Sequence, residues 1–156
     1  MEFSLRDFAK TDFETLWRID QQCFAPGISY SQPELAAYIR LLGSFTLVAE
    51  NPDSRDVLGF LVATAARHSG HIITIDVLPE ARCLGVGSRL LSTAEDRLRK
   101  AQCSKARLET AVNNHAALRF YKRHSYFVVK TIPRYYADGV DAIVLEKHLF
   151  SPPADK

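Results

Sequence analysis

The chain has 156 residues, 47% of them hydrophobic and 24% charged, a length and balance typical of one globular domain with a sizeable core. The net charge of +2, with no basic run, argues against a nucleic-acid-binding protein. No apolar run reaches membrane-spanning length, and the N-terminus lacks the basic start and apolar core of a signal peptide. We therefore expect neither nucleic acid nor a membrane as a partner.

The cysteines and histidines exclude further classes. Cys23, Cys83 and Cys103 are odd in number and scattered, which favours free thiols and a cytoplasmic protein. The histidines show no metal-ligand spacing with one another or with the cysteines, so we expect no metal. His68 and His71 flank a Ser-Gly pair, and we interpret these four residues as a solvated hairpin turn.

The first half of the chain alternates helical and strand patterns. Thr11 is a candidate helix cap with Glu14 three residues later, and Ser31 is a second candidate cap. Turn residues at 25–27 and Gly43 end the two helices. In chain order we expect a strand at 3–8, helices at 11–24 and 31–42, and strands at 45–50, 57–66 and 72–78.

The second half continues the alternation. A helix follows Gly87 and runs to about Gln102, and a shorter helix starts at Asn114. We expect strands at 106–112, 126–132 and 142–149, with a turn at 137–139 between the last two. This order predicts an α/β domain with a mixed sheet over residues 1–150 and a polar, proline-containing tail at 151–156.

One stretch, residues 71–91, joins a buried strand to a helix through a loop with two glycines. The strand at 72–78 is apolar and β-branched, Pro79 ends it, and Gly85 and Gly87 precede the helix. The first N–H groups of a helix have no partner within it, and the helix dipole is positive there, so this arrangement suits an anion. An ordinary strand–turn–helix corner has the same pattern, so the stretch alone leaves both interpretations open.

The loop pattern Arg82-x-x-Gly85-x-Gly87 is neither the phosphate loop of nucleotide triphosphatases nor the dinucleotide fingerprint. It resembles the Gln/Arg-x-x-Gly-x-Gly/Ala signature of the GNAT superfamily of N-acetyltransferases. The resemblance implies a GNAT-like α/β fold: a single domain with a mixed, mostly antiparallel central sheet, flanking helices and a splayed strand pair at the cofactor site. It implies that acetyl-CoA binds along the central strand and the glycine loop, at Ile75, Asp76, Val77, Arg82, Cys83, Leu84, Gly85, Val86, Gly87 and Ser88.

A second segment, residues 108–127, resembles the GNAT form Leu-Glu-Val-x-x-x-Asn-x-x-Ala-x-x-x-Tyr-x-x-x-Gly-Phe. The glycine before the final phenylalanine is Tyr126 here, which removes a flexible corner and touches no catalytic role. The resemblance implies that Glu109 is the general base and that Tyr121 assists departure of the thiolate. It also implies cofactor contacts by Asn114, Ala117 and Tyr121.

Each of these residues has a purely structural alternative. Glu109 fits a solvated strand carboxylate or a partner for Arg107. Tyr121 fits a core aromatic at helical spacing from Leu118, and Asn114 fits a helix cap, a role compatible with a cofactor contact.

Two further segments resemble the N-terminal protein acetyltransferases, the group that includes the ribosomal-protein-alanine enzymes. Residues 134–142 carry a tyrosine pair and resemble the hairpin over the acceptor peptide, and residues 24–30 resemble the opposing loop, one residue longer than its commonest form. The resemblance implies that the acceptor is the N-terminal α-amine of a protein or peptide. It implies acceptor contacts by Phe24, Ile28, Tyr30, Tyr135 and Tyr136.

Other functions remain open. A small amine (a polyamine, amino acid or antibiotic) would favour an acidic pocket, whereas Asp138 is the only carboxylate in residues 24–30 and 134–140, which favours a peptide. A module that only senses acetyl-CoA would need neither Glu109 nor Tyr121. Asp76 is a second carboxylate candidate, although strand alternation separates it from Ile75 and Val77. We expect a monomer or weak dimer.

Overall fold

The computed structural model describes residues 2–150, so the predicted tail at 151–156 lies outside the described residues. The first elements are β1 (Ser4–Asp7), a 3-10 helix (Lys10–Asp12), α1 (Phe13–Cys23), α2 (Gln32–Arg40), β2 (Ser44–Glu50) and β3 (Val57–Ala66). They are followed by β4 (Ser69–Val77), a 3-10 helix (Pro79–Ala81), α3 (Val86–Lys100), β5 (Lys105–Ala111), α4 (His115–Arg123), β6 (Phe127–Ile132) and β7 (Ala142–His148).

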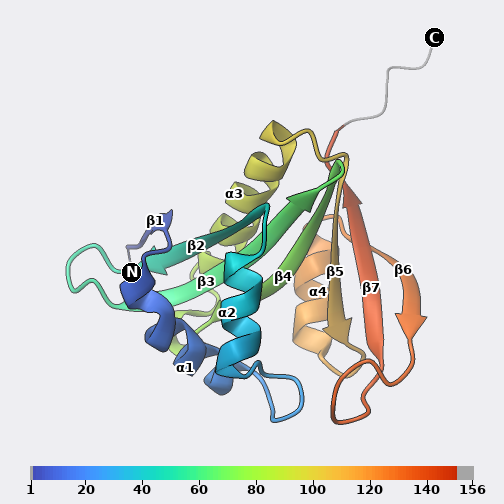
Figure 1. Cartoon of the computed structure of the whole chain (residues 1–156), viewed down its shortest axis with the longest axis horizontal. Coiled ribbons are helices and arrows are strands. Elements are labelled where there is room, and N and C mark those ends of the chain that lie inside the picture. The colour runs from blue at the N-terminus through green and yellow to red at the C-terminus, as the bar shows by residue number, and fades with distance from the viewer. Residues whose placement is uncertain (1, 151–156) are drawn as a thin grey trace.

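The strands form one sheet in the order β1-β2-β3-β4-β5-β7-β6 (Figure 1). The β4–β5 pairing is parallel and every other pairing is antiparallel. The parallel pair needs a crossover, which α3 supplies between β4 and β5. The predicted mixed, mostly antiparallel sheet with flanking helices is confirmed.

Strands β4 and β5 separate soon after they meet. They pair only from Ser69 with Lys105 to His71 with Arg107, and beyond that point Figure 1 shows them diverging. A bulge accompanies the separation: Thr74 pairs with Val62 and Ile72 with Ala63, so one residue of β4 has no opposite partner. Bulges bend a strand and increase its twist. The predicted splayed strand pair is therefore confirmed.

The sheet is covered by helices on both faces. Strand β3 is apolar throughout because both of its faces are buried. Leu61 packs in the cluster beneath α3, whereas Phe60 and Val62 pack beneath α1 and α2. On one face Leu90, Leu91, Ala94 and Leu98 of α3 are fully buried, and on the other Leu16 of α1 and Leu35 of α2 are. Full burial of such a leucine stabilises the fold by about 1.5–3 kcal/mol relative to an exposed one.

The two predicted helix caps have different outcomes. The Ser31 cap is confirmed, because its hydroxyl accepts from the Glu34 amide at 3.2 Å and Glu34 Oε1 accepts from the Ser31 amide at 2.9 Å. The Thr11 cap is wrong. A 3-10 turn precedes α1, Thr11 is exposed, and the Asp12 carboxylate accepts from the Ala9 amide at 2.8 Å. Asp12 takes this place because its carboxylate also pairs with Arg6.

The predicted turn at residues 68–71 is also misplaced. The β3–β4 hairpin turns at Arg67 and His68, which have φ angles of 52° and 65°, the left-handed conformation of a two-residue hairpin loop. Gly70 lies within β4, where a Cβ atom would come within 2.6 Å of the Leu98 side chain. The glycine thus serves the close approach of α3, and His71 becomes a strand residue.

Candidate active site

The glycine loop has the predicted geometry of an anion site. Gly85 is the N-cap of α3 with a φ angle of +89°, and no side chain caps the helix. The first amides of α3 are consequently left for a ligand. Cys83 is also left-handed, with a φ angle of 65°, while Arg82 Nε donates to the Val77 carbonyl at 3.0 Å. The chain therefore reverses tightly between β4 and α3 and presents backbone N–H groups.

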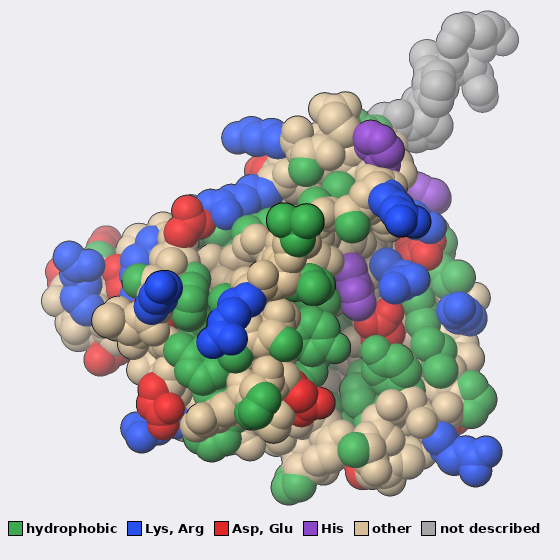
Figure 2. All heavy atoms as spheres, viewed as in Figure 1, with side chains coloured by type: hydrophobic (Ala, Val, Ile, Leu, Met, Phe, Trp, Pro, Cys, Tyr) green, Lys and Arg blue, Asp and Glu red, His purple; other side chains and the backbone are tan. Residues whose placement is uncertain are grey.

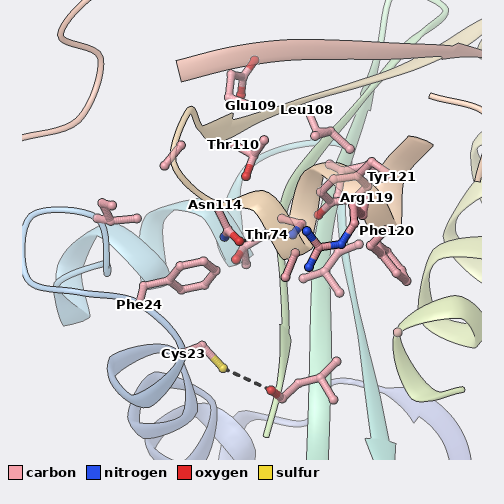
Figure 3. A pocket seen from close by; sticks show the side chains of 18 of the residues that line it. Cys23, Phe24, Thr74, Leu108, Glu109, Thr110, Asn114, Arg119, Phe120 and Tyr121 are labelled. Atoms are coloured by element: carbon pink, nitrogen blue, oxygen red, sulfur yellow. Dashed lines mark hydrogen bonds between the residues drawn. The ribbon is translucent and has the colours of Figure 1, made fainter. Parts of the chain in front are cut away.

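A cavity of about 780 Å³ starts at this loop and follows the gap between β4 and β5. Its lining comes from the first turn of α3, both strands, α4 and the loops α1–α2 and β6–β7. Figure 2 shows the surface hollowed between α2 and β5–β7, with hydrophobic side chains on both sides. In Figure 3, Glu109 comes from β5, Arg119 and Tyr121 from α4, and Phe24 from the α1–α2 loop.

Glu109 lies in this cavity in an ordered environment. Its side chain is 11% exposed, and its Oε1 lies 2.7 Å from His71 Nε2. Its Oε2 lies 3.4 Å from Arg107 Nε, so the predicted alternative partner is present as well. An ionised carboxylate only accepts hydrogen bonds, so the His71 proton toward Glu109 resides on Nε2.

The interpretation of His71 as a solvated turn residue was wrong. The parallel pairing of β4 with β5 places His71 opposite Arg107, two residues before Glu109. Nothing local in the sequence signals this contact, because the two residues are 38 positions apart and meet only through the sheet.

Tyr121 and Asn114 are both brought to the cavity by α4. Tyr121 is 9% exposed, and burial raises the pKa of its hydroxyl above the ordinary value. Asn114 caps α4 as predicted, because its Oδ1 accepts from the Ala117 amide at 3.1 Å. Both Asn114 and Ala117 also line the cavity, so the cap leaves the Asn114 side chain in reach of a ligand.

The two predicted acceptor loops meet at the cavity. The Ala137 amide donates to the Gly27 carbonyl at 3.1 Å, a contact we call the loop bridge. The rings of Tyr135 and Tyr136 lie edge to face with centroids 4.9 Å apart. Burial raises the pKa of both hydroxyls. Both tyrosines line the cavity, together with Phe24, Ile28 and Tyr30.

Three predicted cofactor residues turn their side chains elsewhere. Asp76 is 1% exposed and faces α1, Val86 is fully buried, and Leu84 is 41% exposed outside the cavity lining. Their backbone contacts stay predictions. The predicted residues Ile75, Val77, Arg82, Cys83, Gly85, Gly87 and Ser88 do line the cavity.

Two arginines of α4 were missed. Arg119 and Arg123, one helical turn apart, line the cavity, and Ser88 of the glycine loop lies 3.0 Å from His124 Nε2. The sequence signal was the i, i+4 spacing of these two cations within the second segment, residues 108–127, which the apolar stripe of the helix obscured. Among residues 2–150, no group of three His, Cys, Asp or Glu side chains is placed to hold a metal. In the same range, no helix has the length and apolar character needed to cross a membrane.

Comparison with known proteins identifies the family to which this chain belongs. The acetyltransferase (GNAT) family profile matches residues 13–126. The chain is 34% identical over 144 residues to an uncharacterized N-acetyltransferase of Methanocaldococcus jannaschii, covering 92% of this chain and 90% of that protein. It is 35% identical over 77 residues to an N-alpha-acetyltransferase of Sulfurisphaera tokodaii, covering 49% of this chain and 46% of the relative.

The fold agrees with these matches. The crystal structure of Ard1 from Thermoplasma volcanium superposes with a TM-score of 0.87 at 25% identity, covering 97% of this chain and all of that one. The predicted resemblance to N-acetyltransferases of the N-terminal protein type is therefore confirmed at the level of relatives and fold. This chain belongs to the GNAT family and is an acetyl-CoA-dependent N-acetyltransferase.

Proposed function

We propose that the enzyme acetylates the N-terminal α-amine of a protein or peptide. The observation that carries the proposal is the loop bridge, which joins the two acceptor loops beside Tyr135 and Tyr136 in the cavity lining. This part of the lining is aromatic, which suits a peptide backbone and apolar side chains, whereas a polycation would favour an acidic lining. The Sulfurisphaera tokodaii relative, an N-alpha-acetyltransferase, supports the same acceptor class.

Acetyl-CoA fits the rest of the cavity. The amides at the start of α3, freed by the absence of a side-chain cap, suit its pyrophosphate. Arg119 and Arg123 supply positive charge on the neighbouring face of α4. The gap between β4 and β5 then takes the pantetheine arm, with Asn114 and Ala117 at its side.

The acceptor amine must lose a proton to attack the thioester, and Glu109 is the proposed base. Its side chain is held at Oε1 by His71 and at Oε2 by Arg107, so it has a defined orientation toward the cavity. His71 is the proposed positioning partner, because its imidazole Nε2 fixes the carboxylate at Oε1.

Attack on the carbonyl carbon places negative charge on its oxygen. Backbone N–H groups of β4 near Ile75–Val77, freed from β5 by the splay, are proposed to stabilise that charge. The carbon–sulfur bond then breaks and the electron pair stays on sulfur. Because burial raises the pKa of Tyr121, its hydroxyl keeps its proton and stabilises the departing thiolate by donating a hydrogen bond.

We also propose that the enzyme works in the cytoplasm as a monomer or weak dimer. Its three cysteines are free thiols, and Cys83 is exposed, which suits a reducing compartment.

The acceptor class is tested by release of coenzyme A thiol from acetyl-CoA in the presence of a panel of N-terminal peptides and a panel of polyamines. We expect turnover with peptides, and none with the same peptides carrying a blocked α-amine. Turnover with polyamines alone would reject the proposed acceptor.

A further inference from the structure

Two buried carboxyl groups face each other outside the reaction chemistry described above. Asp20 of α1 is fully buried and Asp76 of β4 is 1% exposed. Burying two carboxylates together is costly, because each loses its hydration and the two charges repel. A fold that retains this pair needs a compensating interaction.

Each carboxyl group has one satisfied oxygen and one unsatisfied oxygen. Asp20 Oδ2 accepts from the Tyr30 amide at 2.7 Å, and Asp76 Oδ1 accepts from the Thr74 hydroxyl. Asp20 Oδ1 and Asp76 Oδ2 are both buried without a partner, and Asp20 is a hydrogen-bonding and charged neighbour that raises the pKa of Asp76. Ionised carboxylates only accept, so a contact between them requires a proton.

The surroundings of Asp76 favour its protonated form. Burial raises the pKa of Asp76 well above its ordinary range, and the neighbouring Asp20 raises it further, while the Thr74 hydroxyl and the Arg82 charge oppose the shift. Arg82 is exposed, so water screens its charge. The titratable and charged groups that face the pair come from α1, the α1–α2 loop, the glycine loop and α4: Cys23, Tyr30, Arg82 and Tyr121.

The pair connects the acceptor wall to the central strand. Asp20 holds the Tyr30 amide, while the Tyr30 carbonyl accepts from Trp17 Nε1 at 3.0 Å and from Gln21 Nε2 at 2.7 Å. The Tyr30 hydroxyl donates to the Ile73 carbonyl at 3.4 Å, at the bulge of β4. Asp76 holds Thr74, which lines the cavity as Tyr30 does.

We propose that Asp20 and Asp76 share one proton, and that this shared proton holds the Tyr30 wall of the acceptor site against the central strand. The assignment of Tyr30 to the acceptor site rests on the proposed function, whereas the shared proton does not. Both aspartates are positioning residues, since they act through Tyr30 and Thr74.

The proposal predicts a loss of order as the pH rises through the folded-state pKa of Asp76. The folded-state pKa of Asp76 lies above the unfolded value of about 3.9. The stability that the protonated pair contributes is therefore complete below the unfolded pKa and is lost as the pH rises through the folded pKa. Once both carboxyls are ionised their repulsion displaces the Tyr30 segment, so the KM for a peptide rises while the KM for acetyl-CoA does not.

The first measurement uses Trp17, the only tryptophan of the chain, whose indole N–H is bonded to the Tyr30 carbonyl. Its ¹H–¹⁵N resonance should shift in the wild type as the pH rises through the folded-state pKa of Asp76, and it should stay constant in Asp76→Asn. An asparagine amide donates to Asp20 without a shared proton. The same titration in both proteins would overturn the proposal.

The second measurement is the denaturant midpoint as a function of pH. The wild-type midpoint should fall with rising pH, and Asp76→Asn and Asp20→Asn should each flatten that fall. Asp12→Asn is the matched control, because Arg6 lowers the pKa of this buried carboxyl. The contribution of the Asp12 carboxylate is present above its unfolded pKa and is lost as the pH falls, so Asp12→Asn should lower the midpoint at neutral pH and leave intact the fall with rising pH. An unchanged fall with rising pH in both Asp76→Asn and Asp20→Asn would reject the shared proton.

The third measurement is the peptide KM across the same pH range. The ratio of wild-type KM to Asp76→Asn KM should rise severalfold as the pair ionises, at constant acetyl-CoA KM. A KM ratio that stays constant with pH would reject the positioning role of the two aspartates, even if the Trp17 resonance shifts with pH. If the wild type turns over no peptide, the proposed function fails, and the resonance and the midpoint still decide whether the proton is shared.

Discussion

At the scale of single residues, the active site depends on contacts that orient a few polar groups. Glu109 is held between His71 and Arg107, whereas Tyr121 is buried against the opposite side of the cavity. The two groups are proposed to serve different steps: Glu109 accepts the proton of the acceptor amine, and Tyr121 stabilises the departing thiolate.

Glu109→Gln tests this division of roles. The variant keeps the size and polarity of the side chain but loses its basicity, so kcat should fall by about two to four orders of magnitude at neutral pH. Raising the pH should recover much of the loss, because more of the amine is then neutral without help. Steady-state kinetics over a pH series measures both effects.

Tyr121→Phe is the matched variant in the same cavity. Its defect lies at thiolate departure, so alkaline pH should not restore it, whereas a thioester with a better leaving group should. The same pH dependence in both variants would falsify the division, and near-normal kcat in Glu109→Gln would move the base to another residue.

At the scale of elements, the β4–loop–α3 unit creates the anion site. The left-handed Gly85 starts α3 with uncapped amides, and Gly87 opens toward the cavity in its first turn. A Cβ atom at Gly87 would lie 3.4 Å from the Phe120 ring, an ordinary contact. A side chain at this position therefore changes the ligand site before it changes the fold.

Gly87→Asp should abolish the stabilisation of the protein by acetyl-CoA, because it places a carboxylate where the pyrophosphate is proposed to bind. In thermal unfolding, a saturating ligand at about 100 times its Kd stabilises the folded state by about 2.7 kcal/mol. Ser92→Asp, which adds the same charge on the exposed face of α3, should retain this protection. Full protection of Gly87→Asp would place the phosphates elsewhere.

Tyr126 occupies the position at which the resembled family pattern has a glycine, and it makes contacts that a glycine could not make. The Tyr126 hydroxyl donates to Glu95 Oε2 at 2.8 Å, and Lys147 Nζ lies 2.9 Å from Glu95 Oε1. The aromatic residue thus ties the start of β6 to α3 and β7. None of these three residues lines the cavity, although the Tyr126 ring packs edge to face on Tyr121.

At the scale of the whole molecule, the proposed acceptor site is made by segments more than a hundred residues apart. The α1–α2 loop and the β6–β7 loop meet through the loop bridge, and Gly27 is so close to Asp138 that a Cβ atom there would lie 2.8 Å from the aspartate Cβ. Neither loop forms the acceptor end of the cavity alone. The N-terminal helices and the C-terminal hairpin must therefore dock before a peptide can bind.

Tyr136→Ala should raise the peptide KM by about tenfold or more while leaving the acetyl-CoA KM unchanged, because a truncated aromatic anchor costs on the order of 1–3 kcal/mol of binding. Tyr126→Phe is the control: it removes the Glu95 hydrogen bond and lowers stability by about 1–3 kcal/mol, with neither KM affected. Equal changes in both KM values for Tyr136→Ala would point to a small amine as the acceptor.

The sequence by itself determined the features that depend on local pattern. Hydrophobic periods located the strands and helices, because burial on a sheet or helix face follows spacing along the chain. The Ser31 and Asn114 caps and the glycine-loop start of α3 were predictable for the same reason, since their hydrogen bonds join residues three or four apart. The motifs at Arg82, Glu109 and Tyr121 identified the family.

Only the tertiary structure decided which distant groups meet. The short parallel pairing of β4 and β5 brought His71 to Glu109, and the packing of α1 on β4 brought Asp20 to Asp76. The loop bridge likewise joins Gly27 to Ala137. These contacts arise from sheet order and helix packing, which no local spacing encodes, and they orient the side chains around the cavity.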